Sequence, residues 1–337
     1  MDPQKPFPTL RLPFLAIEEV FKAMHPFEMQ VVYINFSLIS NRTKQVTKMM
    51  TFHPEYSVAL DISKNLQVAI RGTDKIVSNI YEMTSKKVAD GVTKEVVGRI
   101  ELTVFKYSKD PVEEWKQMCV HVLEIFKKHS IENLRVCMDG FVSHNVSIVD
   151  FLTTNEISLN ECSLFHWDRK INVDEHAAYL LNNLNVTNEL NSYLHIKNAN
   201  FDGRIPKGLK KLHILHSQWV GYERLLKIDS VQVDLIRDRI SYNDWNLFFK
   251  KWMAMETNLN LESWNFGFES MEDFRELVLY DIPYEVVDEG VKRTLQTSYG
   301  SPREINGGVD IRRIDGKTAT FCVILTDLGD NSFLFIH

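Results

Sequence analysis

The apolar residues near the N-terminus recur at helical spacing. Because about 3.6 residues make one helical turn, five of them fall on one stripe of a helix: Phe14, Ile17, Val20, Phe21 and Met24. Pro13 can serve as the first helical residue, and His25-Pro26 predicts the end of the helix, since a residue before proline is pushed out of the α region. The pattern therefore predicts a short amphipathic helix that opens the fold.

A second apolar group, at residues 27–33, leads into a third predicted helix. Asn35 or Ser37 can cap this helix, which runs toward Met50, because both side chains accept a hydrogen bond from a free backbone N–H group. A segment of about 45 residues rarely closes a sufficient core by itself. An apolar face of these helices therefore needs a cover, either the rest of this chain or a second protein.

Beyond Pro54 the apolar period changes to two. Three segments alternate apolar and polar side chains between turn-forming residues: 56–62, 66–72 and 96–105. Such alternation is typical of antiparallel strands, so we expect a small antiparallel β unit in residues 55–110. Pro111 then opens a helix that keeps its apolar period and ends near His129.

Short strands with helical segments between them recur in the rest of the chain. Five segments have the length and the apolar content of a strand: 134–138, 192–196, 212–216, 230–235 and 259–264. Ser241 opens a helix to Met253 whose one side carries four aromatic residues: Trp245, Phe248, Phe249 and Trp252. This alternation is typical of a leucine-rich-repeat-like solenoid, although the chain contains no repeat consensus.

The C-terminus returns to strand patterning. Residues 309–314 and 318–325 flank Asp315-Gly316, a dipeptide that suits a tight hairpin turn. Residues 333–336 can form one further strand. We therefore expect the chain to end in a β-hairpin.

Composition and charge narrow the class of protein. The 337 residues predict about two domains, and 44% hydrophobic with 25% charged residues is ordinary for a folded protein. With 39 Lys and Arg against 45 Asp and Glu, the net charge of −6 argues against a dedicated nucleic-acid binder. The apolar stretch at 12–17 is too short for a secretory signal, and no stretch of about 18 apolar residues predicts a bilayer span. We expect a cytoplasmic or nuclear protein.

The candidate chemical motifs are weak. Gly316-Lys317-Thr318 imitates the end of a phosphate-binding loop, but Ile311 stands where that loop needs a glycine. On a strand, His213 and His216 point to opposite faces. The four cysteines have no CxxC spacing, so buried thiols are expected.

Two polar clusters remain after this test. The lysines at 207, 210 and 211 are interpreted as a solvated face. Asp174-Glu175-His176 contains the groups for acid–base chemistry or metal binding, but adjacent side chains seldom converge. We expect no catalytic activity, no cofactor and no metal, and the cluster at 174–176 keeps an enzyme as an open alternative.

The N-terminal segment resembles an F-box. That pattern has Leu-Pro opening the first helix, spaced aliphatic residues along it, and a serine-leucine-x-serine-x-arginine third helix. Ten residues match it in order: Leu12, Pro13, Ile17, Val20, Phe21, Met24, Leu38, Ile39, Ser40 and Arg42. The remainder, especially 245–252 and 307–320, resembles the F-box-associated region (type 2) of the large nematode F-box families.

The patterning and this resemblance together predict an α+β fold in three parts. They are an F-box of three helices at 6–54, the small antiparallel β unit at 55–110, and a repeat-like α/β F-box-associated domain at 111–337. The chain is about four residues longer than the F-box pattern near Gln30 to Tyr33. If this insertion distorts the second helix, it weakens adaptor binding.

The resemblance also implies a function. The chain would be the substrate-recognition subunit of an SCF-type (Skp–cullin–F-box) ubiquitin ligase, and its C-terminal domain would bind an unknown target protein. The Skp-type adaptor would contact nine residues: Leu12, Pro13, Ile17, Val20, Phe21, Met24, Phe27, Leu38 and Ile39. The alternative is an interaction scaffold that retains an F-box outside any ligase.

Overall fold

The computed structural model divides the chain into two compact units. The first comprises Met1–Arg135 with Asp150–Ser158, and the second comprises Val136–Val149 with Leu159–His337. The predicted boundaries near residues 54 and 110 both lie inside the first unit. The structure describes residues 12–24, 26–50, 56–72, 77–87, 93–96, 100–198, 200–266, 271–296, 298, 302–326 and 329–337.

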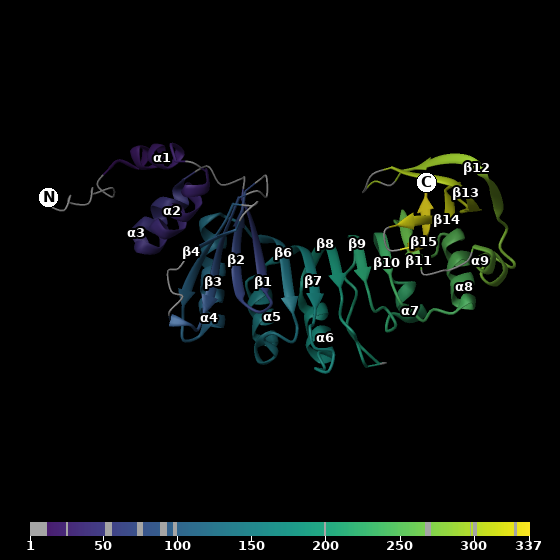
Figure 1. The fold of residues 1–337 in the computed structure, drawn as a ribbon, viewed down its shortest axis with the longest axis horizontal. Helices are drawn as coiled ribbons and strands as arrows, with labels where there is room; N and C mark the ends of the chain where they lie inside the picture. Colours follow the sequence, from purple (N-terminus) through teal and green to yellow (C-terminus); the bar gives the residue numbers. More distant parts are fainter. Residues whose placement is uncertain are drawn as a thin grey trace. The chain divides into compact units, whose positions relative to one another are not determined.

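Three helices begin the first unit (Figure 1): α1 (Phe14–Lys22), α2 (Pro26–Ile39) and α3 (Asn41–Met49). Pro13 is the N-cap of α1 and lies outside the helix, where its carbonyl accepts from the N–H groups of Ala16 and Ile17. The segment near Gln30 to Tyr33 lies within α2, which is continuous over 14 residues. The segment therefore does not interrupt α2, and four residues span about one turn of it.

The start of the third helix was placed wrongly from sequence. Ser40 is the cap, because its hydroxyl accepts from the Thr43 N–H at 3.2 Å and the Thr43 hydroxyl accepts from the Ser40 N–H at 2.9 Å. Ser37 instead lies inside α2, where its hydroxyl donates to the Ile34 carbonyl at 2.7 Å. A mid-helix serine commonly makes such a back-bond, and it cannot be told from a capping serine by residue type alone.

The sheet of the first unit has the strand order β6-β1-β2-β3-β5-β4. Its strands are β1 (Ser57–Ile62), β2 (Leu66–Arg71), β3 (Val77–Thr84), β4 (Thr93–Val96), β5 (Ile100–Tyr107) and β6 (Ser130–Cys137). The β1–β2, β2–β3 and β4–β5 pairs are antiparallel, as expected. The β3–β5 pair is parallel, which corrects the expectation of a purely antiparallel unit. The cause is topological, because β4 lies on the far side of β5 and not between it and β3.

Helix α4 (Pro111–Ile125) confirms the predicted helix after Pro111. The Asp110 carboxylate caps it by accepting from the Glu113 N–H at 3.1 Å. Trp115 is fully buried on its inner face, and its indole N–H donates to the Gln67 carbonyl of β2 at 3.1 Å. The apolar face of α4 thus covers the sheet.

In the second unit, strands β7 to β11 lie side by side in the order of their numbers (Figure 1). The strands are β7 (Ser158–Phe165), β8 (Asn185–Ser192), β9 (Leu209–Ile214), β10 (Ser230–Leu235) and β11 (Ser263–Phe266). The β8–β9, β9–β10 and β10–β11 pairs are parallel. Helices α6 (Asp174–Asn183), α7 (Gly221–Leu225) and α8 (Tyr242–Met253) lie among these strands in the sequence. Before β7 come η3 (Val142–His144) and α5 (Asn145–Thr154), and the residues of α5 from Asp150 on belong to the first unit.

Two of these strands were placed wrongly from sequence. The segment 259–264 was expected as a strand, but β11 begins only at Ser263 and residues 259–262 precede it. The segment 192–196 was expected as a strand, but β8 spans Asn185–Ser192 and residues 193–196 leave the sheet. Only Val186, Leu190 and Ser192 of β8 are buried, and the remaining positions are polar. Because most residues of β8 are polar, a prediction based on apolar residues does not recognise it as a strand.

Antiparallel strands complete the second unit: β12 (Glu285–Leu295), β13 (Arg303–Arg312), β14 (Thr318–Thr326) and β15 (Gly329–Ile336). Their order is β12-β13-β14-β15, and β15 also pairs antiparallel with β11. The β13–β14 hairpin and its turn at Asp315-Gly316 are confirmed, with Gly316 at φ +94°. Helix α9 (Met271–Leu277) precedes β12.

Aromatic side chains form the core beneath α8. Phe249 lies 5.1 Å from Phe321 and 5.9 Å from Phe274, measured between ring centroids, and Trp245 lies 5.4 Å from Trp264. All four aromatic residues predicted on one side of this helix are buried. None of the helices in the described ranges is long and apolar enough to cross a membrane.

Candidate functional site

The N-terminal helices are held together by an aromatic core. Phe21 of α1 contacts Tyr33 and Phe36 of α2, with ring centroids 5.8 and 5.4 Å apart. The Tyr33 hydroxyl donates to the Thr47 carbonyl of α3 at 2.6 Å, and burial raises the pKa of this phenol. These contacts fix α1, α2 and α3 relative to one another.

The same helices pack on the rest of the first unit. The Tyr33 ring lies 5.7 Å from Phe126, just after α4. Ser37 and His121 of α4 form a hydrogen bond of 2.7 Å, and burial, with Lys44 nearby, lowers the pKa of His121 to about 4. Part of the apolar surface of these helices is therefore covered by this chain itself.

Two lysines of α3 clamp one carboxylate of α4. The Glu124 carboxylate lies 2.5 Å from the Lys44 ammonium and 2.8 Å from that of Lys48. These two hydrogen bonds lower the pKa of Glu124 to about 2, that of Lys44 having the larger effect. Helix α3 is thus joined to α4 by charge as well as by packing.

The nine predicted adaptor contacts divide by exposure. Ile17 and Phe21 are buried, with 2% and 3% of their surface exposed, so they hold the helices together and are not accessible to a partner in this arrangement. Five others are exposed or half-buried: Leu12, Pro13, Met24, Leu38 and Ile39. Val20 is exposed by 44%, whereas the Phe27 side chain lies outside the described residues.

Three further apolar side chains of these helices are exposed: Leu15 (70%), Val32 (38%) and Met49 (59%). They are not among the predicted contacts, because a helical wheel does not say which side of a short apolar helix its neighbours cover. Val32 and Ile39 are seven positions apart in α2 and thus share a face. Exposed aliphatic residues on all three helices give this segment the character of an interaction surface.

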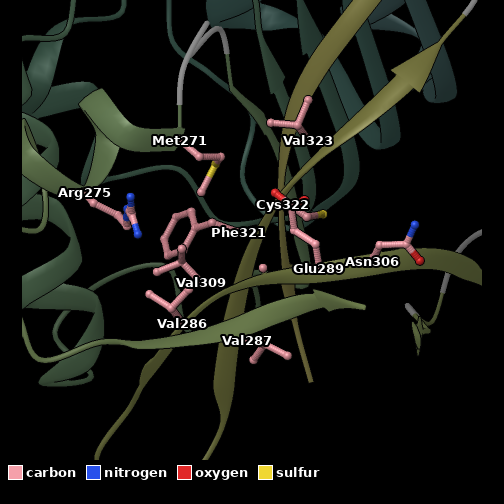
Figure 2. A pocket seen from close by; sticks show the side chains of 11 residues that line it. Met271, Arg275, Val286, Val287, Glu289, Asn306, Val309, Phe321, Cys322 and Val323 are labelled. Atoms are coloured by element: carbon pink, nitrogen blue, oxygen red, sulfur yellow. The ribbon is translucent and has the colours of Figure 1, made fainter. Parts of the chain in front are cut away.

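The second unit contains a hollow between α9 and the C-terminal strands (Figure 2). Its volume is about 460 Å³. Met271 and Arg275 of α9 face Val286 of β12, Val309 of β13 and Phe321 of β14 (Figure 2). Its lining also contains Glu289 and Asn306, so apolar side chains, one cation, one carboxylate and one amide share the hollow.

A pair of glycines lies in β13 beside this hollow, and Gly308 is one of its lining residues. Gly308 has φ +124°, and a Cβ there would lie 2.9 Å from the Phe321 carbonyl oxygen. Gly307 has φ +62°, with the Val287 carbonyl 2.8 Å from an added Cβ. Only glycine permits β13 to approach both neighbouring strands this closely.

Two side chains of the candidate acid–base cluster lie in different environments. The Asp174 carboxylate is buried at the first turn of α6 and accepts from the N–H groups of Lys197 and Asn198, at 3.1 and 2.7 Å. Glu175 is exposed. In the described part of the chain, no group of three or more His, Cys, Asp or Glu side chains is placed to hold a metal.

The remaining sequence candidates have structural partners. His213 pairs with Asp234 of β10 at 2.7 Å, whereas His216 is buried with its Nδ1 3.4 Å from Arg237. The Gly316-Lys317 segment forms the hairpin turn after β13, in which the Gly316 N–H donates to the Arg313 carbonyl. All four cysteines are buried and free, as expected.

Residues 200–266 match the model of an F-box-associated family. The matched segment contains β9, α7, β10, α8 and β11, and it does not extend to α1–α3. The match supports the C-terminal part of the F-box resemblance and a role in protein interaction. The comparisons with curated proteins and with solved structures returned no match.

Proposed function

We propose that this chain is the substrate-recognition subunit of an SCF-type ubiquitin ligase. The observation that carries the proposal is the match of residues 200–266 to an F-box-associated family. In this role α1–α3 form an F-box that binds a Skp-type adaptor, which connects the chain to a cullin-RING ligase. The repeat-like second unit, solenoid in character, binds the target, and the protein works in the cytoplasm or nucleus.

Such a subunit performs no covalent chemistry. It raises the effective concentration of a bound target near the ligase, so both of its surfaces need to be accessible together. The exposed aliphatic residues of α1–α3 supply apolar anchors for the adaptor, with Leu38 and Ile39 adjacent at the end of α2. Ile17 and Phe21 are buried, so in this proposal they support the fold of the F-box and do not contact the adaptor.

The experiment is a titration of the full chain with a purified Skp-type adaptor. Leu38→Glu and Ile39→Glu change exposed positions, and each is expected to weaken binding by about 2 kcal/mol, as loss of an anchor does. The control is Ile314→Glu, which alters an apolar side chain that is 75% exposed on the β13–β14 turn. Failure of the unaltered chain to bind the adaptor would overturn the proposal.

A second experiment separates the ligase from the scaffold alternative. The longer α2 motivates that alternative, because one extra turn changes the spacing between α1 and α3 along the chain. Reconstitution with adaptor, cullin and RING subunit should give one complex. A chain that binds the adaptor while excluding the cullin would be a scaffold outside the ligase.

A further inference from the structure

A small basic pocket lies within the segment that matches the F-box-associated family. Its volume is about 310 Å³, near the lower end for ligand sites and sufficient for a few side chains. It is lined by Asp202, Gly203, Arg204, Ile205, Lys207, Arg224 and Lys227. Four cations and one carboxylate give the lining a formal charge of +3, in a chain whose net charge is −6.

Most of these charges are unneutralised. Among the residues that the structure describes, Arg204, Lys207 and Lys227 take part in no ion pair. All three are exposed. By contrast, the nearby Lys211 pairs with Glu189 at 3.0 Å. The lysine cluster of the sequence is therefore not one uniform solvated face, because Lys207 lines a cavity and Lys211 pairs across two strands.

The fourth cation is fixed by the fold. The Arg224 guanidinium donates to the carbonyls of Trp219, at 2.7 Å, and Phe201. It also lies 5.5 Å from the centroid of the Trp219 ring. These contacts join α7 to the loop before β9, so the two walls of the pocket keep their positions relative to each other.

The loop wall is held by a close contact at Gly203. A Cβ at this position would lie 2.4 Å from the Phe201 ring and 3.1 Å from Leu181. Phe201 in turn packs edge-on against Trp219, with ring centroids 4.8 Å apart. A preformed wall lowers the cost of ordering a bound segment.

We infer that this pocket binds an acidic peptide segment of the target protein. Unpaired cations at a preformed cavity attract a carboxylate or phosphate group, and Ile205 with the lysine stems contacts the apolar part of the segment. A long polyanion such as nucleic acid would be repelled by the net negative charge of the rest of the chain, which favours a short acidic segment. The inference rests on the proposed function, and it specifies that the target protein carries an acidic segment.

The test uses the full chain and a short fluorescein-labelled peptide that alternates glutamate with leucine. Anisotropy is measured without adaptor, so the result does not depend on the F-box. A second peptide carries glutamine in place of glutamate, a third carries phosphoserine, and inorganic phosphate serves as a competitor. We expect the two anionic peptides to bind about tenfold or more tightly than the glutamine peptide, with affinity falling as salt rises.

Charge reversal locates the site. Lys207→Glu combined with Lys227→Glu should weaken binding of the anionic peptides about tenfold or more. Lys210→Glu is the matched control, since Lys210 is exposed but does not line the pocket. All of these positions are exposed, and circular dichroism checks that each variant remains folded. Adaptor binding of the double variant should be unchanged, which separates this pocket from the proposed F-box.

Four outcomes would overturn the inference. They are the absence of binding by both anionic peptides, equal binding of the glutamine peptide, equal weakening by Lys210→Glu, and binding of phosphate alone without either peptide. If adaptor binding fails but the acidic peptides bind at this pocket, the proposed ligase role is wrong and the peptide site stands.

Discussion

The clamp between α3 and α4 gives a testable prediction about how the N-terminal helices are held. Glu124→Gln keeps the shape of the side chain and removes the charge that faces Lys44 and Lys48. The Glu124 carboxylate lies 2.5 and 2.8 Å from the two ammonium groups. We expect α3 to open more readily in this variant, because two lysines then lose their shared anion.

The size of the effect follows from the exposure of the pair. About a third of the Glu124 side chain is exposed, at 35%, so water screens both interactions. We therefore expect a loss of about 1 kcal/mol in the free energy of local unfolding. The folded pKa of about 2 lies below the ordinary value of 4.5. The stabilisation is thus complete above pH 4.5 and is lost as the pH falls toward 2.

Hydrogen–deuterium exchange of α3 amides measures this local opening. Comparing the two proteins at the same pH cancels the intrinsic exchange rates. The gap between the unaltered chain and Glu124→Gln should be largest at neutral pH and close as pH 2 is approached. Glu19→Gln is the control, because Glu19 is 71% exposed and pairs with Lys22 on the surface of α1. Equal protection at neutral pH, or a gap that persists undiminished at pH 2, would refute the reasoning.

Two further predictions concern the second unit. Phe249→Ala should lower the free energy of unfolding of the second unit by about 3–5 kcal/mol, because a fully buried ring is lost. Urea titration followed by tryptophan fluorescence measures this loss. The control Leu247→Ala changes a position that is 47% exposed and should lower the free energy of unfolding far less. Similar losses in both variants would contradict the assigned core. Gly308→Ala should cost more than about 1 kcal/mol in the same assay, since its Cβ would lie 2.9 Å from a carbonyl oxygen. Gly316→Ala should lower the free energy of unfolding less, because Gly316 has φ +94° but open space around it. A larger loss in Gly316→Ala than in Gly308→Ala would exclude steric contact as the cause.

Periodic elements were predictable from the sequence because local rules decide them. The first helix, the helix after Pro111, the aromatic side of α8 and the Asp315-Gly316 hairpin all appear in the structure. The cap of α3 was misassigned because Ser37 and Ser40 are equivalent as residue types. Only the hydrogen bonds of Ser40 with Thr43 distinguish the two.

The candidate sites were less predictable, because exposure depends on distant parts of the chain. Ile17 and Val20 look alike on a helical wheel, yet Ile17 is buried and Val20 is 44% exposed. The basic pocket joins Lys207 to Arg224 and Lys227 across a strand and a helix. A charge count along the sequence places Lys207 with Lys210 and Lys211, which lie outside that pocket.

The sequence by itself determined the amphipathic helices, most of the strands and the resemblance to an F-box protein, because periodicity, capping residues and motif spacing are local properties. Tertiary structure alone decided which apolar side chains remain exposed, that β3 pairs parallel with β5, and that Asp174 is engaged by backbone N–H groups. These outcomes depend on which surfaces meet when the chain folds, and burial and electrostatic pairing are set only by those contacts.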